Sequence, residues 1–440
     1  MKYEKLIKEG LKQGFSDLEI YSSTVKKMNV LVFQEEVEKN EVSNLTNYTI
    51  RGIFKGKMAY LNSENMNQSP KKVIEKLKNN ANSLTTIQEA EIFEGSNRYS
   101  KVKNNYGKFD KISTKEKINL LLSLEKEIKQ LDDRIVHIPY CSYDEIQREV
   151  SIINSKGLNL NKKYEYAYLA VQAVAKENTQ TQSYFDVEVQ KEFAKFDVKK
   201  FSKKVVDRVI AMLKASPVDS GEYDIIFENR SMIDLLTAFL AIFSSERAME
   251  KRNLLSDKVG EIIMDEKINI IEDPLYENAI INNPFDDEGV ATYKKSIVEN
   301  GKLLTLLYNL KTAKFYKTKS TGNGFKMGSG IGIGCSNLII MPGEKSLEQL
   351  VKETKNGLLI TKVAGLHAGV NDISGDFSIQ SSGFQIIEGE IKKSVNLIVV
   401  SGNFFKLMKN VLDVANDLEF SYNSFGAPSI KFKSLQVSGK

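Results

Sequence analysis

The chain has 440 residues, of which 41% are hydrophobic and 27% charged. This is the composition of an ordinary soluble protein with enough length for about two to three domains. The 62 Lys and Arg residues exceed the 57 Asp and Glu residues by only five. No basic block interleaved with aromatic residues stands out, so a nucleic-acid partner is not expected.

The cysteine content and the opening residues bear on the cellular compartment in which the protein is expected. The two cysteines, Cys141 and Cys335, are too few and too far apart for a disulfide framework, which favours a reducing compartment. The opening residues lack the apolar core of a signal peptide, and no uninterrupted apolar run is long enough to span a membrane. We therefore expect a cytoplasmic protein that does not enter a membrane.

The first 70 residues predict a helix followed by strands. Apolar residues at helical spacing from Tyr3 predict an amphipathic helix that ends near Gly14. Two strand candidates follow, one around Leu18 and Ile20 and another over Met28–Phe33. The alternation on either side of Lys55-Gly56 is typical of a hairpin.

Two capped helices and a meander should complete the first half. Ser69 precedes Pro70 at the start of one helical pattern, and Ser113 with Glu116 has the spacing of a capping box at the start of another. Period-two segments from residue 135 to about 198 predict an antiparallel meander, and helical spacing returns over 201–213. Pro217 interrupts this helix, so we predict an α+β domain over residues 1–215 and a second domain over 216–440.

The second domain is punctuated by glycine-rich turns. Asn283-Pro-Phe-Asp-Asp-Glu-Gly, Ser320-Thr-Gly-Asn-Gly, the glycines from 328 to 334 and Gly375-Asp-Phe-Ser are each followed by a short apolar run. Glycine supplies positive φ at tight turns, so this spacing predicts many short strands. We expect a β-rich antiparallel domain, which makes the whole chain α+β.

The order of these clusters, from about Gly221 to the C-terminus, resembles the C-terminal domain of the TldD/PmbA family. That bacterial and archaeal family is associated with metal-dependent proteolysis. Its name also records an association with modulation of DNA gyrase, which the residues neither support nor exclude. In its catalytic TldD branch, a strand like Tyr223–Phe227 leads to a helix with His-Glu-x-x-x-His. Two histidines one turn apart can hold zinc, and the glutamate can act as base on a zinc-bound water.

The motif is missing from this chain. Aligned on the strand, its place is taken by residues 236–241, with Leu236, Thr237 and Ala241 at the key positions. The chain has only two histidines, His137 and His367. We therefore expect residues 232–243 to form a packing helix with no catalytic or metal-binding residues.

Loss of the motif resembles the TldE branch, also called PmbA, whose members are metal-free partners of TldD. The resemblance implies a homo- or heterodimer, an enclosed cavity for peptide or unfolded protein, and zinc only in a TldD-like partner. The leading interpretation is a non-catalytic subunit of such a metalloprotease complex. The alternatives are a stand-alone homodimeric peptide-binding or regulatory protein, and an unrecognised hydrolase that uses His367 or carboxylates.

Three further signals have more than one interpretation. A strand, not a helix, should follow Gly330 and Gly332, so these glycines favour a tight backbone path over a nucleotide site. We interpret this path as a place where an extended peptide passes. The carboxylates of 286–288 suit a turn better than a calcium loop. Asp376, with Phe377 and Ser378, matches the family's Gly-Asp-Phe-Ser signature, where a structural hydrogen-bonding role is expected.

Overall fold

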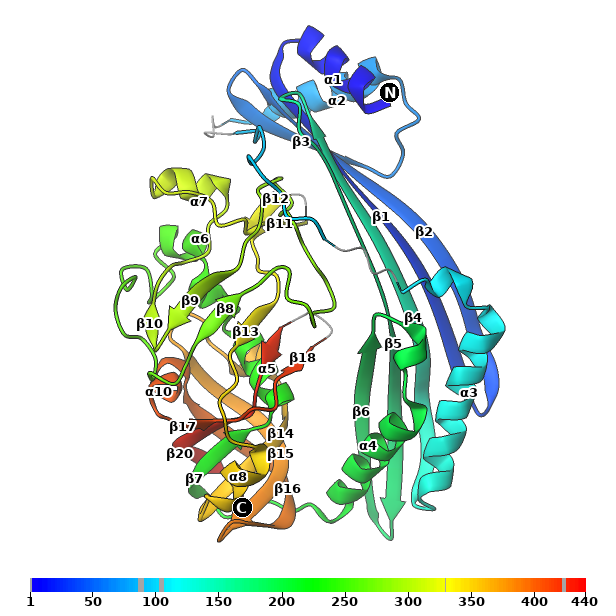
Figure 1. Ribbon diagram of the computed structural model, residues 1–440, viewed down its shortest axis with the longest axis vertical. Coiled ribbons are helices and arrows are strands. Elements are labelled where there is room, and N and C mark those ends of the chain that lie inside the picture. Colours follow the sequence, from blue (N-terminus) through cyan, green and yellow to red (C-terminus); the bar gives the residue numbers. More distant parts are fainter. Residues whose placement is uncertain (1, 86–90, 103–106, 329, 422–424) are drawn as a thin grey trace.

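A computed structural model describes residues 2–85, 91–102, 107–328, 330–421 and 425–440. The fold is α+β, as predicted, with one long curved sheet in the first half of the chain and a more compact β-rich second half (Figure 1). No helix within these ranges is long and apolar enough to cross a membrane.

The first half is built on a six-stranded antiparallel sheet with the order β3-β2-β1-β4-β5-β6. Its strands are β1 (Phe15–Phe33), β2 (Glu36–Phe54), β3 (Lys57–Ser63), β4 (Ile135–Asn154), β5 (Asn159–Glu177) and β6 (Gln180–Gln190). The hairpin at Lys55-Gly56 joins β2 and β3, and both turn residues have positive φ.

One strand prediction was wrong, because the two strands expected around Leu18 and over 28–33 are the single strand β1. The polar residues between them suggested a break. In the structure Ser23 pairs with Asn47 of β2 and Val150 of β4, so both sides of the backbone are hydrogen-bonded within the sheet. Such a run does not need apolar side chains to remain a strand.

Two of the four helices of the first half, those at 70 and 114, begin where their caps predict, and the helix predicted from 201 begins three residues earlier, at Val198. They are α1 (Lys2–Lys12), α2 (Pro70–Ser83), α3 (Thr114–Leu131) and α4 (Val198–Ala211), with 3₁₀ turns at Phe109–Lys111, Phe193–Lys195 and Met212–Lys214. The Ser69 hydroxyl accepts a hydrogen bond from the Lys72 amide, and Ser113 and Glu116 form the predicted capping box. Helices α3 and α4 bury their apolar sides against one face of the sheet.

The second half contains two six-stranded sheets, ordered β16-β15-β14-β7-β20-β17 and β10-β9-β8-β13-β19-β18, and the hairpin β11-β12. Their strands are β7 (Gly221–Phe227), β8 (Ile270–Glu272), β9 (Lys295–Glu299), β10 (Lys302–Leu303), β11 (Gly324–Met327), β12 (Gly330–Ile333), β13 (Leu338–Ile340), β14 (Asn356–Ala364), β15 (Asp376–Ile387), β16 (Glu390–Asn403), β17 (Val411–Val414), β18 (Glu419–Phe420), β19 (Gly426–Ala427) and β20 (Ile430–Ser438). Most pairings are antiparallel, but β7 runs parallel to β14, and β13 runs parallel to β19.

Both of these sheets contribute to one large hydrophobic core. The helices of this half are α5 (Asn229–Ala238), α6 (Ser245–Met249), α7 (Leu310–Phe315), α8 (Leu347–Lys352), α9 (Leu366–Gly369) and α10 (Phe404–Lys409), with a 3₁₀ turn at Leu240–Phe243. Phe239, just after α5, stacks on Phe404 with ring centroids 4.3 Å apart. Burial of such rings fixes α5 against the sheet that contains β7 and β14.

Candidate functional site

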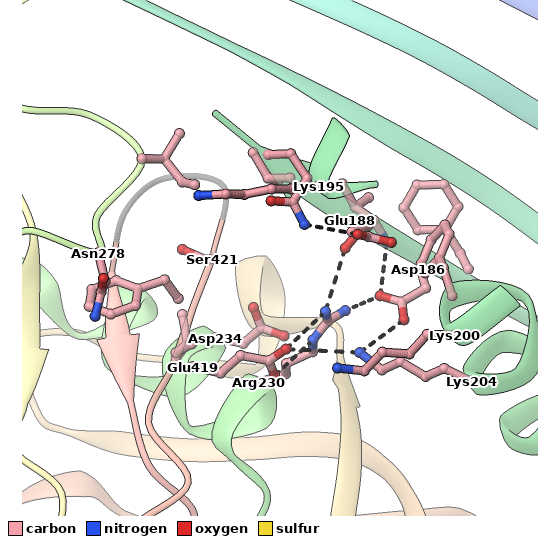
Figure 2. A pocket seen from close by; sticks show the side chains of 18 of the residues that line it. Asp186, Glu188, Lys195, Lys200, Lys204, Arg230, Asp234, Asn278, Glu419 and Ser421 are labelled. Atoms are coloured by element: carbon pink, nitrogen blue, oxygen red, sulfur yellow. Dashed lines mark hydrogen bonds and ion pairs between the residues drawn. The ribbon is translucent and has the colours of Figure 1, made fainter. Parts of the chain in front are cut away.

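A cleft of about 920 Å³ lies between the two halves of the chain. Its walls come from β6 and α4 of the first half and from α5, β14 and β18 of the second. Figure 2 shows side chains that line it, in which charged groups such as Asp186, Glu188 and Arg230 stand beside apolar ones. The cleft is therefore a mixed polar and apolar space that depends on how the two halves pack together.

Strand β6 presents its edge to this cleft. Seven consecutive β6 residues, Tyr184 to Gln190, line it, although alternate side chains of a strand point to opposite faces of a sheet. β6 is also the last strand of its sheet and pairs only with β5 among the described strands. An outer strand carries a row of backbone groups that can pair with another extended chain.

The outward backbone groups of β6 are only partly occupied. The Val187 amide donates to Oδ1 of Asp186 at 2.8 Å, and its carbonyl accepts a long hydrogen bond of 3.5 Å from Nη2 of Arg230. Because antiparallel pairing alternates along a strand, the backbone groups of Phe185 and Val189 point the same way as those of Val187. Within the described ranges, neither residue forms a backbone hydrogen bond on that outward side.

Four charged residues join β6 and α4 to the second half, and we call them the Asp186 network. Asp186 is fully buried and pairs with Arg230 and, at 3.3 Å, with Nζ of Lys204. Arg230 also pairs with Glu419 at 3.3 Å. Burial alone would raise the pKa of Glu419, but Arg230 and Lys204 outweigh it and hold that pKa below its usual value.

A second cavity of about 440 Å³ adjoins the first. Ile233, Asp234 and Ser421 line both cavities, so they mark the junction. The second cavity also contains Thr237 of α5 and His367 of α9. Arg230, Ile233, Asp234, Thr237 and Ala238 recur at helical spacing and form the face of α5 that borders the two cavities.

The predicted positions of the missing motif lie on different sides of this segment. Leu236 is 1% exposed and belongs to the core. Thr237 borders the second cavity and donates its hydroxyl hydrogen to the Ile233 carbonyl at 2.7 Å. Ala241 lies beyond α5, in the 3₁₀ turn, so the single packing helix predicted over 232–243 is instead a helix and a turn.

The Gly-Asp-Phe-Ser segment supports the loop beside the second cavity. Asp376 accepts hydrogen bonds from Ser374 at 2.8 Å and from Asn403 at 2.9 Å, and these two donors lower its pKa. Phe377 is buried and contacts the Phe239 ring, while the Ser378 hydroxyl bonds that of Ser401. None of the three lines either cavity.

Gly330 and Gly332 lie elsewhere, on the β11-β12 hairpin. Gly330 borders a cavity of about 10 Å³ beside Asp287, Tyr21 and Arg51. A Cβ on Gly330 would meet no atom within 4 Å, and one on Gly332 would meet the flexible Met327 side chain. The structure therefore does not bring these glycines together with the residues of the large cleft.

The turn at 286–288 makes a further contact between the halves. Tyr21 donates its hydroxyl hydrogen to Asp287 at 3.2 Å, and Nζ of Lys162 donates to the Phe285 carbonyl at 2.8 Å. Gly289 has a φ of 87°, which fits the predicted turn. We call this group the Asp287 contact.

Two family models match the chain. Residues 220–439 match the PmbA/TldA metallopeptidase C-terminal domain, and residues 107–213 match the central domain of the same group. The chain belongs to the PmbA/TldD family. The C-terminal match alone covers half of the chain, and the central match was not foreseen from the sequence.

Similar proteins extend over most of the chain. A PmbA metalloprotease homologue of Haemophilus influenzae is 28% identical over 327 residues, which are 73% of this chain and 69% of that protein. A solved structure from Thermotoga maritima, described as a proposed modulator of a DNA gyrase, has 29% identity and a TM-score of 0.92 over 99% of both chains. TldE from Thermococcus kodakarensis has 25% identity and a TM-score of 0.91 over the full length of both chains.

The family description implies a metal, but the residues at α5 do not fit zinc. On its cavity face, α5 offers one carboxylate, that of Asp234, beside Ile233 and Ala238, which have no donor atoms. Across the cavity, Asp372 is already paired with Arg247 at 3.4 Å. Within the described residues, no group of three or more His, Cys, Asp or Glu side chains is placed to hold a metal ion.

The sequence analysis missed the residues that line the cleft, above all β6, Arg230 and Asp234. One signal was present, because Arg230, Asp234 and Thr237 form a polar stripe at helical spacing on a segment interpreted as purely packing. Strand β6 has no comparable signal. It lines the cleft because it is the outer strand of its sheet, and only the assembled sheet shows which strand is outermost.

Proposed function

We propose that this chain is a non-catalytic, TldE-like subunit of a metalloprotease complex that acts on peptides or unfolded proteins. The observation that carries the proposal is the cavity face of α5, the helix on which the resemblance places the start of the metal motif, because its described residues do not provide a set of zinc ligands. Its membership in the family and its similarity to a protein named TldE support the same assignment. In this proposal zinc belongs to a TldD-like partner, and the assembly works as a dimer in the cytoplasm.

The cleft would hold the substrate in an extended form. Strand addition uses backbone hydrogen bonds and therefore tolerates many sequences, which suits a protease of unfolded chains. The β6 edge offers the required row of backbone groups, and the neighbouring cavities can receive side chains. The chain's own residues would thus bind and align a peptide without taking part in bond cleavage.

The test combines this chain with a family member that carries His-Glu-x-x-x-His. We expect no cleavage of a flexible quenched-fluorescence peptide by this chain alone, and chelator-sensitive cleavage by the mixture well above that of the partner alone. Elemental analysis of the isolated chain should find far less than one zinc per chain. Cleavage by the isolated chain that survives a chelator would refute the proposal, and peptide binding without any association with the partner would favour a stand-alone binding protein.

A further inference from the structure

Asp234 differs from the other acids around the junction of the two cavities in having no partner. Glu419 is neutralised by Arg230, and Asp372 by Arg247. In the part of the chain that the structure describes, the Asp234 carboxylate has neither a hydrogen bond nor an ion pair, and its side chain is exposed to the cavities. Figure 2 shows it beside the Arg230–Glu419 pair but outside it.

The surroundings of Asp234 suit the stem of a cationic side chain. The second cavity has apolar walls from Ile233, Ala238, Leu366 and Val370. A lysine side chain can lay its methylene groups along such walls while its ammonium group meets a carboxylate. Burial raises the pKa of Asp234 above its usual value, and the nearby Arg230 offsets this only in part.

We propose that Asp234 binds a primary ammonium group of the peptide held in the cleft. This inference rests on the proposed peptide-binding function and adds a chemical preference to it. The ammonium can come from a lysine side chain that enters the second cavity or from a free peptide N-terminus that ends at the junction. An ion pair at this junction would favour substrates with a positive charge at one position along the bound strand.

Binding of fluorescent peptides of equal length tests the proposal. One peptide is acetylated and lacks lysine, one has a free N-terminus without lysine, and a series is acetylated with a single lysine moved along the sequence in place of norleucine. The protein variants are Asp234→Asn and, as a matched control, Asp207→Asn. Asp207 lies on α4 outside both cavities, in an exposed pair with Lys203, so its loss changes the net charge equally.

We expect Asp234→Asn to weaken binding of one ammonium-bearing class by about two- to fivefold, as for a partly exposed ion pair. The acetylated, lysine-free peptide should bind both variants like the wild type. The affected class identifies the source: the free N-terminus, or lysine at one register. Asp207→Asn should leave every affinity unchanged.

Two outcomes would overturn the inference. If Asp234→Asn leaves all affinities unchanged, or weakens the uncharged peptide equally, Asp234 does not bind an ammonium group, although the peptide-binding function stands. If no peptide binds the wild-type chain, the proposed peptide-binding role fails and this inference fails with it. Circular dichroism of both variants shows whether the fold is retained.

Discussion

Asp286 shows how one buried carboxylate shapes the turn that joins the halves. It is fully buried, and its two oxygens accept hydrogen bonds from three backbone amides, those of Glu288 at 3.0 Å, Val290 at 2.9 Å and Gly324 at 2.8 Å. All three donors would otherwise be unsatisfied in the interior. The carboxylate therefore fixes its own turn and ties it to β11.

We predict that Asp286→Asn destabilises the protein by about 2 kcal/mol, because the new amide NH₂ must face a backbone N–H donor in the interior. Asp265→Asn is the control, since Asp265 accepts the Lys267 amide at 3.0 Å near the surface and asparagine can replace aspartate in such a turn. The chain has no tryptophan, so urea unfolding is best followed by circular dichroism. Equal midpoints for the two variants would contradict this account of Asp286.

At the scale of elements, the outer position of β6 leads to a prediction about backbone recognition. If a bound peptide pairs with β6 as an added strand, only every second peptide residue directs its N–H and C=O groups toward β6. We therefore expect that N-methylation of one alternating set of peptide amides weakens binding by about thirtyfold, corresponding to two lost hydrogen bonds of about 1 kcal/mol each. N-methylation of the other set should have little effect.

The two N-methylated peptides serve as controls for each other, because they have the same composition and number of methyl groups. Affinities can be measured by competition with a fluorescent unmethylated peptide. Equal binding of both would show that the peptide does not use its backbone in this way. Equal loss in both would mean that both edges of the peptide are engaged, which addition to β6 alone does not explain.

The elements show what the sequence determines locally. Caps such as Ser69 and the Ser113–Glu116 box act within four residues, so the starts of α2 and α3 were predictable. The first part of β2 was not, because residues 36–45 are all exposed and β3 pairs with β2 only from Tyr48 onward. Without a buried side, such a strand has no apolar alternation, and its partner β1 alone holds it in place.

The candidate site was less predictable because it is made by distant segments. Asp186, Arg230 and Glu419 meet although they are separated by 44 residues or more in sequence. Each is an ordinary charged residue in its local context, and nothing nearby indicates its partner. The family resemblance assigns the place of the metal motif to residues 236–241, but only packing of the two halves shows which face of α5 borders the cleft.

At the scale of the whole molecule, two of the contacts that join the halves differ in how far their charges are buried. The Asp287 contact is buried, with the Lys162 and Asp287 side chains 4% and 10% exposed. In the Asp186 network, Asp186 itself is buried, but its partners Arg230 and Lys204, and Glu419, are each at least 35% exposed. Salt screens exposed charges far more than buried ones, since the Debye length falls from about 30 Å at 0.01 M to about 3 Å at 1 M.

Raising the salt concentration should therefore loosen one contact and spare the other. We expect hydrogen exchange of the β6 amides that bond to β5 to become several-fold faster between 0.05 and 1 M NaCl, because the Asp186 network holds β6 against α5. Exchange should change little near Tyr21 and Lys162. Strand β3, the other outer strand of the same sheet, is the control because it contributes no residue to the network. Equal acceleration in β3 would mean that salt acts on strand edges in general, and no acceleration in β6 would mean that packing, not charge, closes the cleft on this side.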